Sequence, residues 1–169
     1  QKGLKKDILI LSGGVSMGEY DLVGEVLLDL GVKIFFEKVA LRPGKPTVFG
    51  MKGDKLIFAL PGNPVSTFVT FELFVKPCIK KMMGYTSYEH PIIHAELEKA
   101  IKIKKKRREY RPALLKQEGS GWKVSLIDWH GSGDLFSLTK ANGLLIISES
   151  VDKLNAGDMV EVMLTDSLL

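Results

Sequence analysis

Two loops rich in glycine and proline carry the residues of this chain that are best suited to hold an anion. The first covers residues 12–21 (SGGVSMGEYD), and the second covers residues 60–66 (LPGNPVS). Each loop follows an apolar run that is typical of a strand and precedes a run with helical spacing. Such loops direct backbone N–H groups and a helix N-terminus outward, a geometry that proteins use to bind phosphates. We therefore expect a site for a phosphorylated or oxyanionic ligand.

A third loop between them, residues 42–46 (RPGKP), adds cations on a backbone that two prolines stiffen. Lys38 and Arg42 are an even number of residues apart, so on an extended segment both would point to one face. Together with Lys45 they could clamp a phosphate or a tetrahedral oxyanion. A solvated basic hairpin is the alternative interpretation of the same residues.

Asp21 closes the first loop, two residues after Glu19. A carboxylate beside an anion site repels the ligand unless a cation mediates, so one interpretation makes Asp21 a Mg²⁺ ligand. The other is that both carboxylates stabilise the N-terminus of the following helix. The residues favour this helix role for Glu19 and leave both roles open for Asp21.

The serines of these loops either donate hydroxyls to the ligand or make loop hydrogen bonds and helix caps. They are Ser12, Ser16 and Ser66, and no histidine lies near them in sequence. A serine hydrolase triad is therefore disfavoured. The G-x-G-x-x-G dinucleotide fingerprint and the Gly-Lys-Ser/Thr phosphate loop are both absent from the sequence.

The bulk properties narrow the class of protein. The 169 residues suffice for one or two small domains, and a formal net charge of +4 does not demand a nucleic-acid partner. The single cysteine, Cys78, excludes an intramolecular disulfide and fits a reducing compartment. No apolar run reaches membrane-spanning length, so we expect a cytoplasmic protein without a membrane partner. The three histidines lack the paired spacing of a zinc site.

Residues 99–111 contain eight cations. Such a run can bind phosphates or nucleic acid. Only Tyr110 places an aromatic ring among the cations, which disfavours a role in binding single-stranded nucleic acid. The usual interpretation is a solvated edge strand that charge protects from aggregation.

Secondary-structure patterns predict an α/β layout for the first half of the chain. The expected elements are a strand at 7–11, a helix over 22–30, a strand over 32–40, a hairpin of 47–49 with 56–60, and a helix from 63 to 84. We expect Asn63 to cap this last helix and Pro64 to occupy its first position. Pro77 should kink the helix or start a second one.

Beyond a linker at 84–91 the apolar period changes to two, which is the period of a strand. Strands are expected at 124–127, 144–147 and 159–164, with a short helix over 134–141. We predict that residues 1–88 form part of a three-layer α/β domain. Residues 89–169 are predicted to form a mainly-β domain that closes into a small barrel.

In this order, the three loop sequences strongly resemble the MoeA family of molybdopterin molybdenumtransferases, to which the E domain of gephyrin is related. Segments 107–110 (RREY), 131–135 (GSGDL) and 141–144 (ANGL) are similar to the family's C-terminal domain. The resemblance implies a molybdopterin-binding, MogA-like first domain. It also implies an enzyme of molybdenum cofactor biosynthesis, which inserts molybdate into adenylylated molybdopterin and releases AMP with the help of Mg²⁺.

The resemblance also implies roles for individual residues. Asp21 matches an active-site aspartate and is the expected metal ligand, while Lys38 and Arg42 match basic positions of the family's active site, where many relatives carry lysine in place of Arg42. Pro61 and Pro64 match prolines that shape the pterin cleft. The full set expected to bind the cofactor or its phosphates is Ser12, Gly13, Gly14, Ser16, Lys45, Pro61, Gly62, Asn63, Pro64, Ser66, Arg107 and Arg108.

The chain begins with Gln1 and enters a strand almost at once, which reads as a piece of a longer protein. Members of the family are more than twice as long, carry further acidic active-site residues upstream, and build the active site across a dimer. We therefore expect a homodimer for the longer protein and little or no catalysis by this chain alone. The upstream molybdopterin adenylyltransferase is an expected partner. A gephyrin-like scaffold, with a peptide groove on the β domain, is the alternative function.

Overall fold

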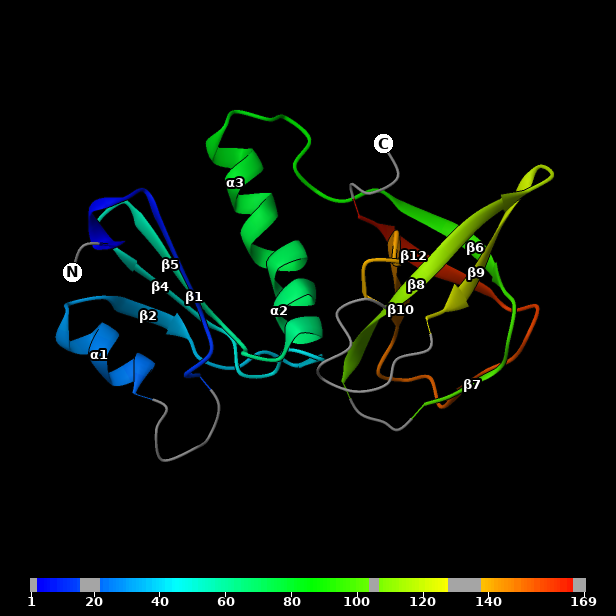
Figure 1. Cartoon of the computed structure of the whole chain (residues 1–169), viewed down its shortest axis with the longest axis horizontal. Coiled ribbons are helices and arrows are strands. Elements are labelled where there is room, and N and C mark those ends of the chain that lie inside the picture. Colours follow the sequence, from blue (N-terminus) through cyan, green and yellow to red (C-terminus); the bar gives the residue numbers. More distant parts are fainter. Residues whose placement is uncertain (1–2, 16–21, 104–106, 128–137, 166–169) are drawn as a thin grey trace. The chain divides into compact units, whose positions relative to one another are not determined.

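A computed structural model describes residues 3–15, 22–103, 107–127 and 138–165 of the chain (Figure 1). The chain divides into two compact units. The first comprises Gln1–Ala40 and Gly44–Val75, and the second comprises Leu41–Pro43 and Lys76–Leu169. In the described part of the chain, no helix is long and apolar enough to cross a membrane.

The first unit is built on a four-stranded mixed sheet. The strands are β1 (Ile8–Ser12), β5 (Lys55–Leu60), β4 (Val48–Lys52) and β2 (Lys33–Phe36), in the order β1-β5-β4-β2. β1 runs parallel to β5, whereas the other neighbours are antiparallel. A two-residue turn joins β4 to β5, with Gly53 at φ 61°, which confirms the predicted hairpin.

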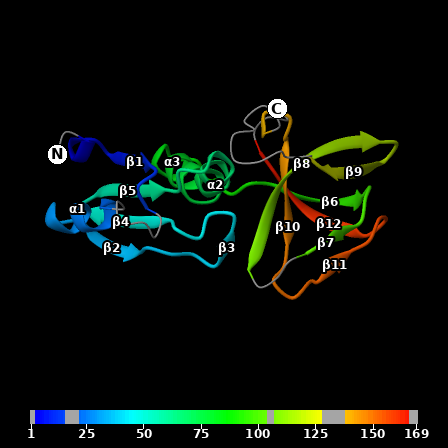
Figure 2. The same cartoon turned by 60° about the horizontal axis from the view of Figure 1, so that its bottom comes forward.

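Helices cover both faces of this sheet, which gives the three layers that the sequence predicted (Figures 1 and 2). On one face α1 (Val23–Asp29) buries Leu27 against Ile57 and Ala59 of β5. Phe58 points to the other face because side chains alternate along a strand. There Phe36 and Phe58 flank Phe49, and the Phe36 and Phe74 rings are 6.1 Å apart. A short 3₁₀ turn, η1 (Gly3–Lys5), precedes β1.

The helical segment after β5 is interrupted shortly before Pro77. α2 (Pro64–Thr70) gives way to one π-helical turn, η2 (Phe71–Val75), and α3 (Lys76–Met82) follows. Pro77 has no N–H and its ring would clash with the carbonyl four residues back, so a regular α-helix cannot run through it. The predicted irregularity at Pro77 is therefore confirmed. Gly84, at φ 84°, ends α3, as predicted.

The second unit is a closed five-stranded barrel. Its strands are β6 (Ile92–Leu97), β8 (Arg108–Glu118), β9 (Gly121–Leu126), β10 (Gly143–Ile147) and β12 (Met159–Leu164). They follow the order β10-β12-β6-β9-β8, and pairing of β8 with β10 closes the ring (Figure 2). Closure removes the sheet edges, which is the reason that the sequence favoured a barrel.

Three short strands complete the second unit. β7 (Ile101–Lys102) pairs with β11 (Lys153–Leu154), and β3 (Leu41–Arg42) runs parallel to the first residues of β8. The predicted apolar period of two is confirmed, because Ala95, Leu97 and Ile101 are buried and Ile93 and Ile103 pack against the same core. The helix expected over 134–141 lies mostly outside the described residues.

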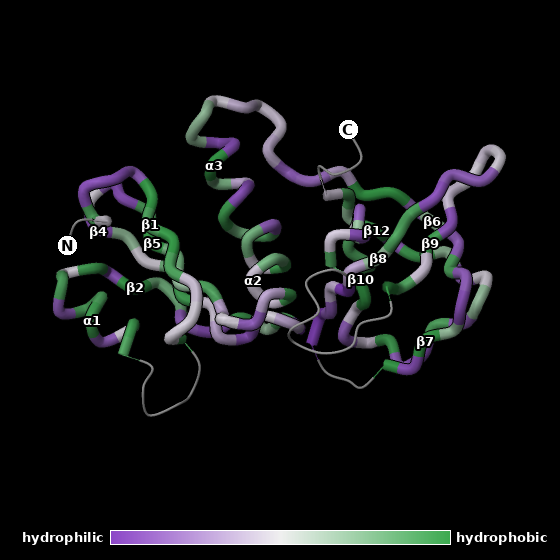
Figure 3. Tube along the Cα trace, viewed as in Figure 1, coloured by the Kyte–Doolittle hydropathy of each residue, from purple (hydrophilic) through white to green (hydrophobic). Residues whose placement is uncertain are grey.

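The cationic run forms an edge strand only in part: among the described residues, Ile101–Lys102 of β7 pairs with β11 alone, in a two-stranded sheet. Residues 108–111 belong to β8, which pairs with β9, β10 and β3, so that interpretation is wrong for this part of the run. Residues 104–106 lie outside the described residues. β8 is hydrophilic at both ends, at Arg108 and Glu109 and again at Lys116 to Glu118, where it forms a hairpin with β9 (Figure 3).

Candidate anion-binding site

The first and last of the three predicted loops lie against each other. The N–H of Gly13 donates to the carbonyl of Leu60 at 3.0 Å, and Ser12 Oγ lies 3.5 Å from the carbonyl oxygen of Pro61. A β-carbon on Gly62 would lie 3.3 Å from the Cα of Gly13. This contact follows from the sheet, because the carboxyl ends of the parallel neighbours β1 and β5 meet at the same edge.

Glycine is required in the first loop for backbone reasons. Gly13 and Gly14 have φ values of 88° and 71°, where side chains with a β-carbon are strained. A β-carbon on Gly14 would also come within 2.8 Å of the Val23 side chain at the start of α1. Ser16 and Asp21, two predicted site residues of this loop, lie outside the described residues.

The second loop is organised around the start of α2. Asn63 Oδ1 accepts from the backbone N–H of Ser66 at 3.1 Å, and the Ser66 hydroxyl donates to the same oxygen at 3.3 Å. Pro64 follows at the first helical position, so the predicted cap is confirmed. The N–H of Thr67 bonds the carbonyl of Asn63. The N–H groups of Ser66 and Thr67 in this first turn are thus used within the protein.

The third loop is packed onto α2 rather than left open. Gly44 has a φ of 112° and is buried, and a β-carbon there would overlap the methyl group of Thr70. The Thr47 hydroxyl donates to the carbonyl of Gly44 at 2.7 Å. The carbonyl of Lys45 accepts from the N–H of Val39 at 2.9 Å, which ties the loop to the segment that carries Lys38.

Lys38 and Arg42 do not lie on one continuous extended segment, so the prediction that they share a face for this reason is wrong. β2 ends at Phe36 and the next strand begins at Leu41, so the expected strand over 32–40 is shorter and no continuous strand joins the two cations. Lys38 and Lys45 are exposed and belong to the first unit, whereas Arg42 belongs to the second.

Arg42 lies instead in a cluster of charged side chains on the barrel. Its Nη1 is 3.2 Å from Oε1 of Glu109, and Nε and Nη2 of Arg111 donate to Oε2 of Glu109 at 2.8 and 2.6 Å. Arg107 Nη1 donates to the carbonyl of Leu41 at 3.0 Å. The structure thus brings the predicted residues Arg42 and Arg107 to the same end of β8.

Glu109 and Arg111 were not among the predicted site residues. In the sequence, Glu109 is the one acidic residue within the cationic run 99–111. It is an even number of residues away from Ala113 and Leu115, which belong to the barrel core. That parity places both side chains on the interior side of β8, and the Glu109 side chain is only 3% exposed. A charge so deeply buried requires partners, and the two arginines supply them.

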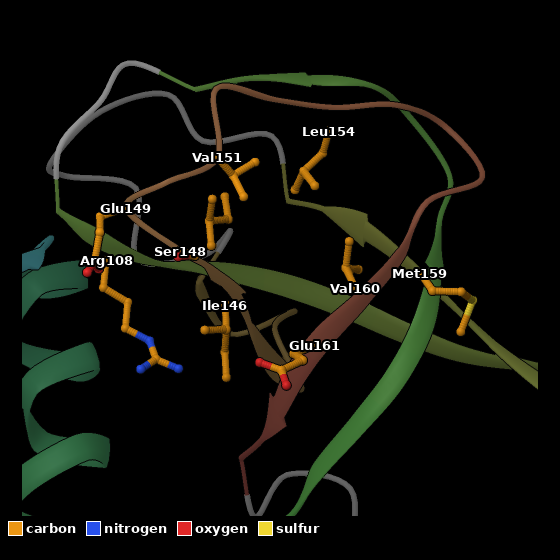
Figure 4. A pocket seen from close by; sticks show the side chains of 10 residues that line it. Arg108, Ile146, Ser148, Glu149, Val151, Leu154, Met159, Val160 and Glu161 are labelled. Carbon is orange, nitrogen blue, oxygen red and sulfur yellow. The ribbon is translucent and has the colours of Figure 1, made fainter.

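Arg108, another predicted binding residue, precedes Glu109 in β8, where successive side chains lie on opposite faces, and borders a cavity on the barrel (Figure 4). The cavity has a volume of about 330 Å³, with Ile146 and Val160 in its lining and Glu149 and Glu161 as carboxylates. The guanidinium carbon of Arg108 lies 5.9 Å from the centre of the Tyr110 ring, a cation–π contact.

The described residues contain no group of three or more histidine, cysteine or acidic side chains that could hold a metal ion. Mg²⁺ is commonly held by one or two carboxylates together with substrate phosphates, so a site of that kind needs few protein ligands. Asp21, the predicted ligand, is among the residues that the structure does not describe.

Two family models match the chain in succession. The "Probable molybdopterin binding domain" matches residues 1–81, and the "MoeA C-terminal region (domain IV)" matches residues 94–165. The molybdopterin molybdenumtransferase of Staphylococcus epidermidis is 32% identical over 161 residues, which is 95% of this chain and 38% of that protein. The corresponding protein of Staphylococcus aureus is 32% identical over 163 residues and is covered to 39%.

Solved structures agree with these matches. The molybdopterin biosynthesis MoeA protein of Pyrococcus horikoshii superposes with a TM-score of 0.73 at 32% identity, covering 94% of this chain and 37% of that chain. A molybdenum cofactor biosynthesis protein of Pyrococcus furiosus gives a TM-score of 0.70 at 27% identity, covering 97% and 51%. The chain thus spans less than half the length of the curated relatives that it matches. Because an α/β segment and a β-barrel follow each other as in these proteins, and both match their family models, the chain belongs to the MoeA family.

Proposed function

We propose that the protein to which this chain belongs is a molybdopterin molybdenumtransferase, which inserts molybdate into adenylylated molybdopterin and releases AMP. The observation that carries the proposal is the contact between the loops after β1 and β5, at Gly13 and Gly62, inside the segment that matches a molybdopterin-binding domain. Both relatives from Staphylococcus carry the name of this activity.

The chemistry of the loops suits this reaction, because the substrates are anions. The pterin phosphate would lie against Ser12, Gly13 and Gly14, with Pro61 and Pro64 shaping the pterin cleft. Exposed Lys38 and Lys45 would offset negative charge at the first unit. Charges that are fixed before reaction stabilise the transition state without reorganisation, so the protein need not supply a covalent nucleophile.

The remaining predicted residues have proposed roles as well. Ser16, Gly62, Asn63 and Ser66 would line the phosphate end of the cleft. Arg42, Arg107 and Arg108 are the proposed anion-binding residues of the second unit. Asp21 would hold Mg²⁺ together with phosphate oxygens of the substrate, and the bound ion would offset the pyrophosphate charge.

We further propose that the longer protein is a cytoplasmic homodimer that receives its substrate from a molybdopterin adenylyltransferase. The lone cysteine is consistent with a reducing compartment.

The test is the substitution Asp21→Ala in the intact protein. Molybdate-dependent release of AMP from adenylylated molybdopterin should fall by about 100-fold or more, the usual cost of removing one preorganised electrostatic partner. Asp54→Ala is the matched control, because Asp54 is an exposed aspartate in the β4–β5 turn, where it pairs with Lys55. Full activity of Asp21→Ala would contradict the proposed role, and a control as weak as the variant would point to damage to the fold.

A further inference from the structure

Glu109 is an unusual residue for the place that it occupies. Its side chain is 3% exposed and both carboxylate oxygens are engaged, one by Arg42 and the other by Arg111. A buried carboxylate is costly unless it is paired and hydrogen-bonded, and here two guanidinium groups meet that requirement. Two cations and one anion leave the trio with a formal charge of +1 in excess.

The same cluster determines where Arg42 lies. β3 is only two residues long, and its register with β8 pairs Leu41 with Arg108 and Arg42 with Glu109. Arg107 adds a bond to the carbonyl of Leu41. Backbone pairing alone fixes so short a strand weakly, so the Glu109–Arg42 ion pair carries a large share of the placement of the Arg42 side chain.

Both arginines keep accessible surface despite the shared carboxylate. The side chains of Arg42 and Arg111 are 46% and 27% exposed. A guanidinium has five N–H donors in a fixed fork that suits tetrahedral oxyanions, and the contacts of Arg111 with Glu109 use only Nε and Nη2.

We infer that Glu109 is a positioning residue, whose buried carboxylate holds Arg42 and Arg111 as a preformed clamp for a tetrahedral dianion. The inference rests on the proposed function, in which such a dianion is a substrate, and names Arg111 as a further contact for it. The clamp binds because two guanidinium groups are held in place before the anion arrives, and this lowers the entropy lost on binding.

If Glu109 acted only through its charge, neutralising it would change the affinity for the anion in the opposite direction. Its negative charge lies beside the cations, so neutralising it would raise the local positive charge and tighten anion binding. Loss of positioning would instead weaken binding, because the two arginines would adopt several conformations. The direction of the change therefore separates the two roles.

The experiment measures binding of tungstate, a tetrahedral dianion, to the intact protein by titration calorimetry at fixed ionic strength. Glu109→Gln should weaken binding by about tenfold, a change of the size expected when a charge-assisted clamp is disordered. Glu118→Gln is the matched control, since Glu118 ends the same strand, pairs with Lys123 and is exposed. It undergoes the same change of charge and should leave the affinity unaltered.

A second variant covers the case in which Glu109→Gln does not fold. Arg111→Lys keeps the cation but loses the two-bond contact with Glu109, and it should also weaken tungstate binding by about tenfold. Unchanged or tighter binding in either folded variant overturns the inference, as does a wild-type protein that binds no tungstate. The AMP-release assay judges the proposed function separately, because its outcome for the wild-type protein does not depend on these variants.

Discussion

Asn63 combines two roles that can be separated by substitution. Its side chain caps α2 through the N–H of Ser66, and it stands in a loop proposed to line the pterin cleft. Asn63→Ala should lower the free energy of unfolding by about 1 kcal/mol, the usual cost of a lost cap. Urea denaturation followed by circular dichroism measures this change.

Asn63→Ser is the control for that measurement, because serine caps a helix as well as asparagine does. Its stability should stay close to that of the wild type. If Asn63→Ala unfolds at the same urea concentration as the wild type but binds molybdopterin less tightly, Asn63 is a ligand and its role as a cap is energetically minor.

The cap could be predicted from the sequence, whereas the contact between Arg42 and Glu109 could not. Asn63 bonds a residue three positions away, so the Asn-Pro pattern contains the whole interaction. Arg42 and Glu109 are 67 residues apart, and only the pairing of β3 with β8 brings them together. Charges that are distant in sequence give no periodic signal.

The RPGKP loop is the element whose packing can be tested most directly. Gly44 lies against Thr70 of α2 with no room for a β-carbon, and its φ of 112° is unfavourable for any other residue. Gly44→Ala should therefore destabilise the protein by about 1–3 kcal/mol, because overpacking and backbone strain add. Differential scanning calorimetry would report the change as a lower Tm.

Gly119 supplies the comparison for this variant. It also has a positive φ, 60°, but a β-carbon there would meet nothing within 4 Å. Gly119→Ala thus isolates the cost of the backbone conformation, and Gly44→Ala should lower the Tm further. Equal effects of the two variants would mean that the contact with Thr70 adjusts without cost.

At the scale of the whole molecule, one side chain extends the pairing of β8 with β10 that closes the barrel. Pairing of β8 with β10 ends at Ala113 and Gly143, and Asn142 then continues the ladder. Its Oδ1 accepts from the N–H of Leu115 at 2.7 Å and its Nδ2 donates to the carbonyl of Leu115 at 2.9 Å. The side-chain amide of Asn142 therefore makes the two hydrogen bonds to Leu115 that the backbone of a further strand residue would make.

Asn142→Ala should cost about 2–3 kcal/mol, because two backbone groups of the buried Leu115 would lose their partners. Hydrogen exchange of the Leu115 amide should accelerate correspondingly. Asn142→Asp keeps the acceptor and loses the donor, so an intermediate loss is expected. A free energy of unfolding unchanged in Asn142→Ala would show that water replaces both bonds and that the seam needs no side chain.

The sequence allowed prediction of an α/β unit followed by a β-barrel, but not of β3, the short strand that an earlier part of the chain adds to the barrel unit. Loop glycines, strand parity and the cap are local signals, so the hairpin, the helices of the first half and most barrel strands were found close to their observed positions. β3 was missed because two residues carry no period, and the strand expected over 32–40 was too long. The meeting of the loops at Gly13 and Gly62 required the parallel pairing of β1 with β5, which no local pattern specifies.

β3 also determines whether the two units can be produced separately. The polypeptide passes between the units after Ala40, after Pro43 and after Val75, so no single cleavage point releases either of them intact. A product that starts at Lys76 would lack Leu41 and Arg42, and the backbone groups at the beginning of β8 would lose the strand beside them. An unpaired strand edge of this kind can pair with other chains. A protein that contains the barrel alone would therefore need Leu41 and Arg42 restored, or substitutions that prevent pairing at the edge of β8.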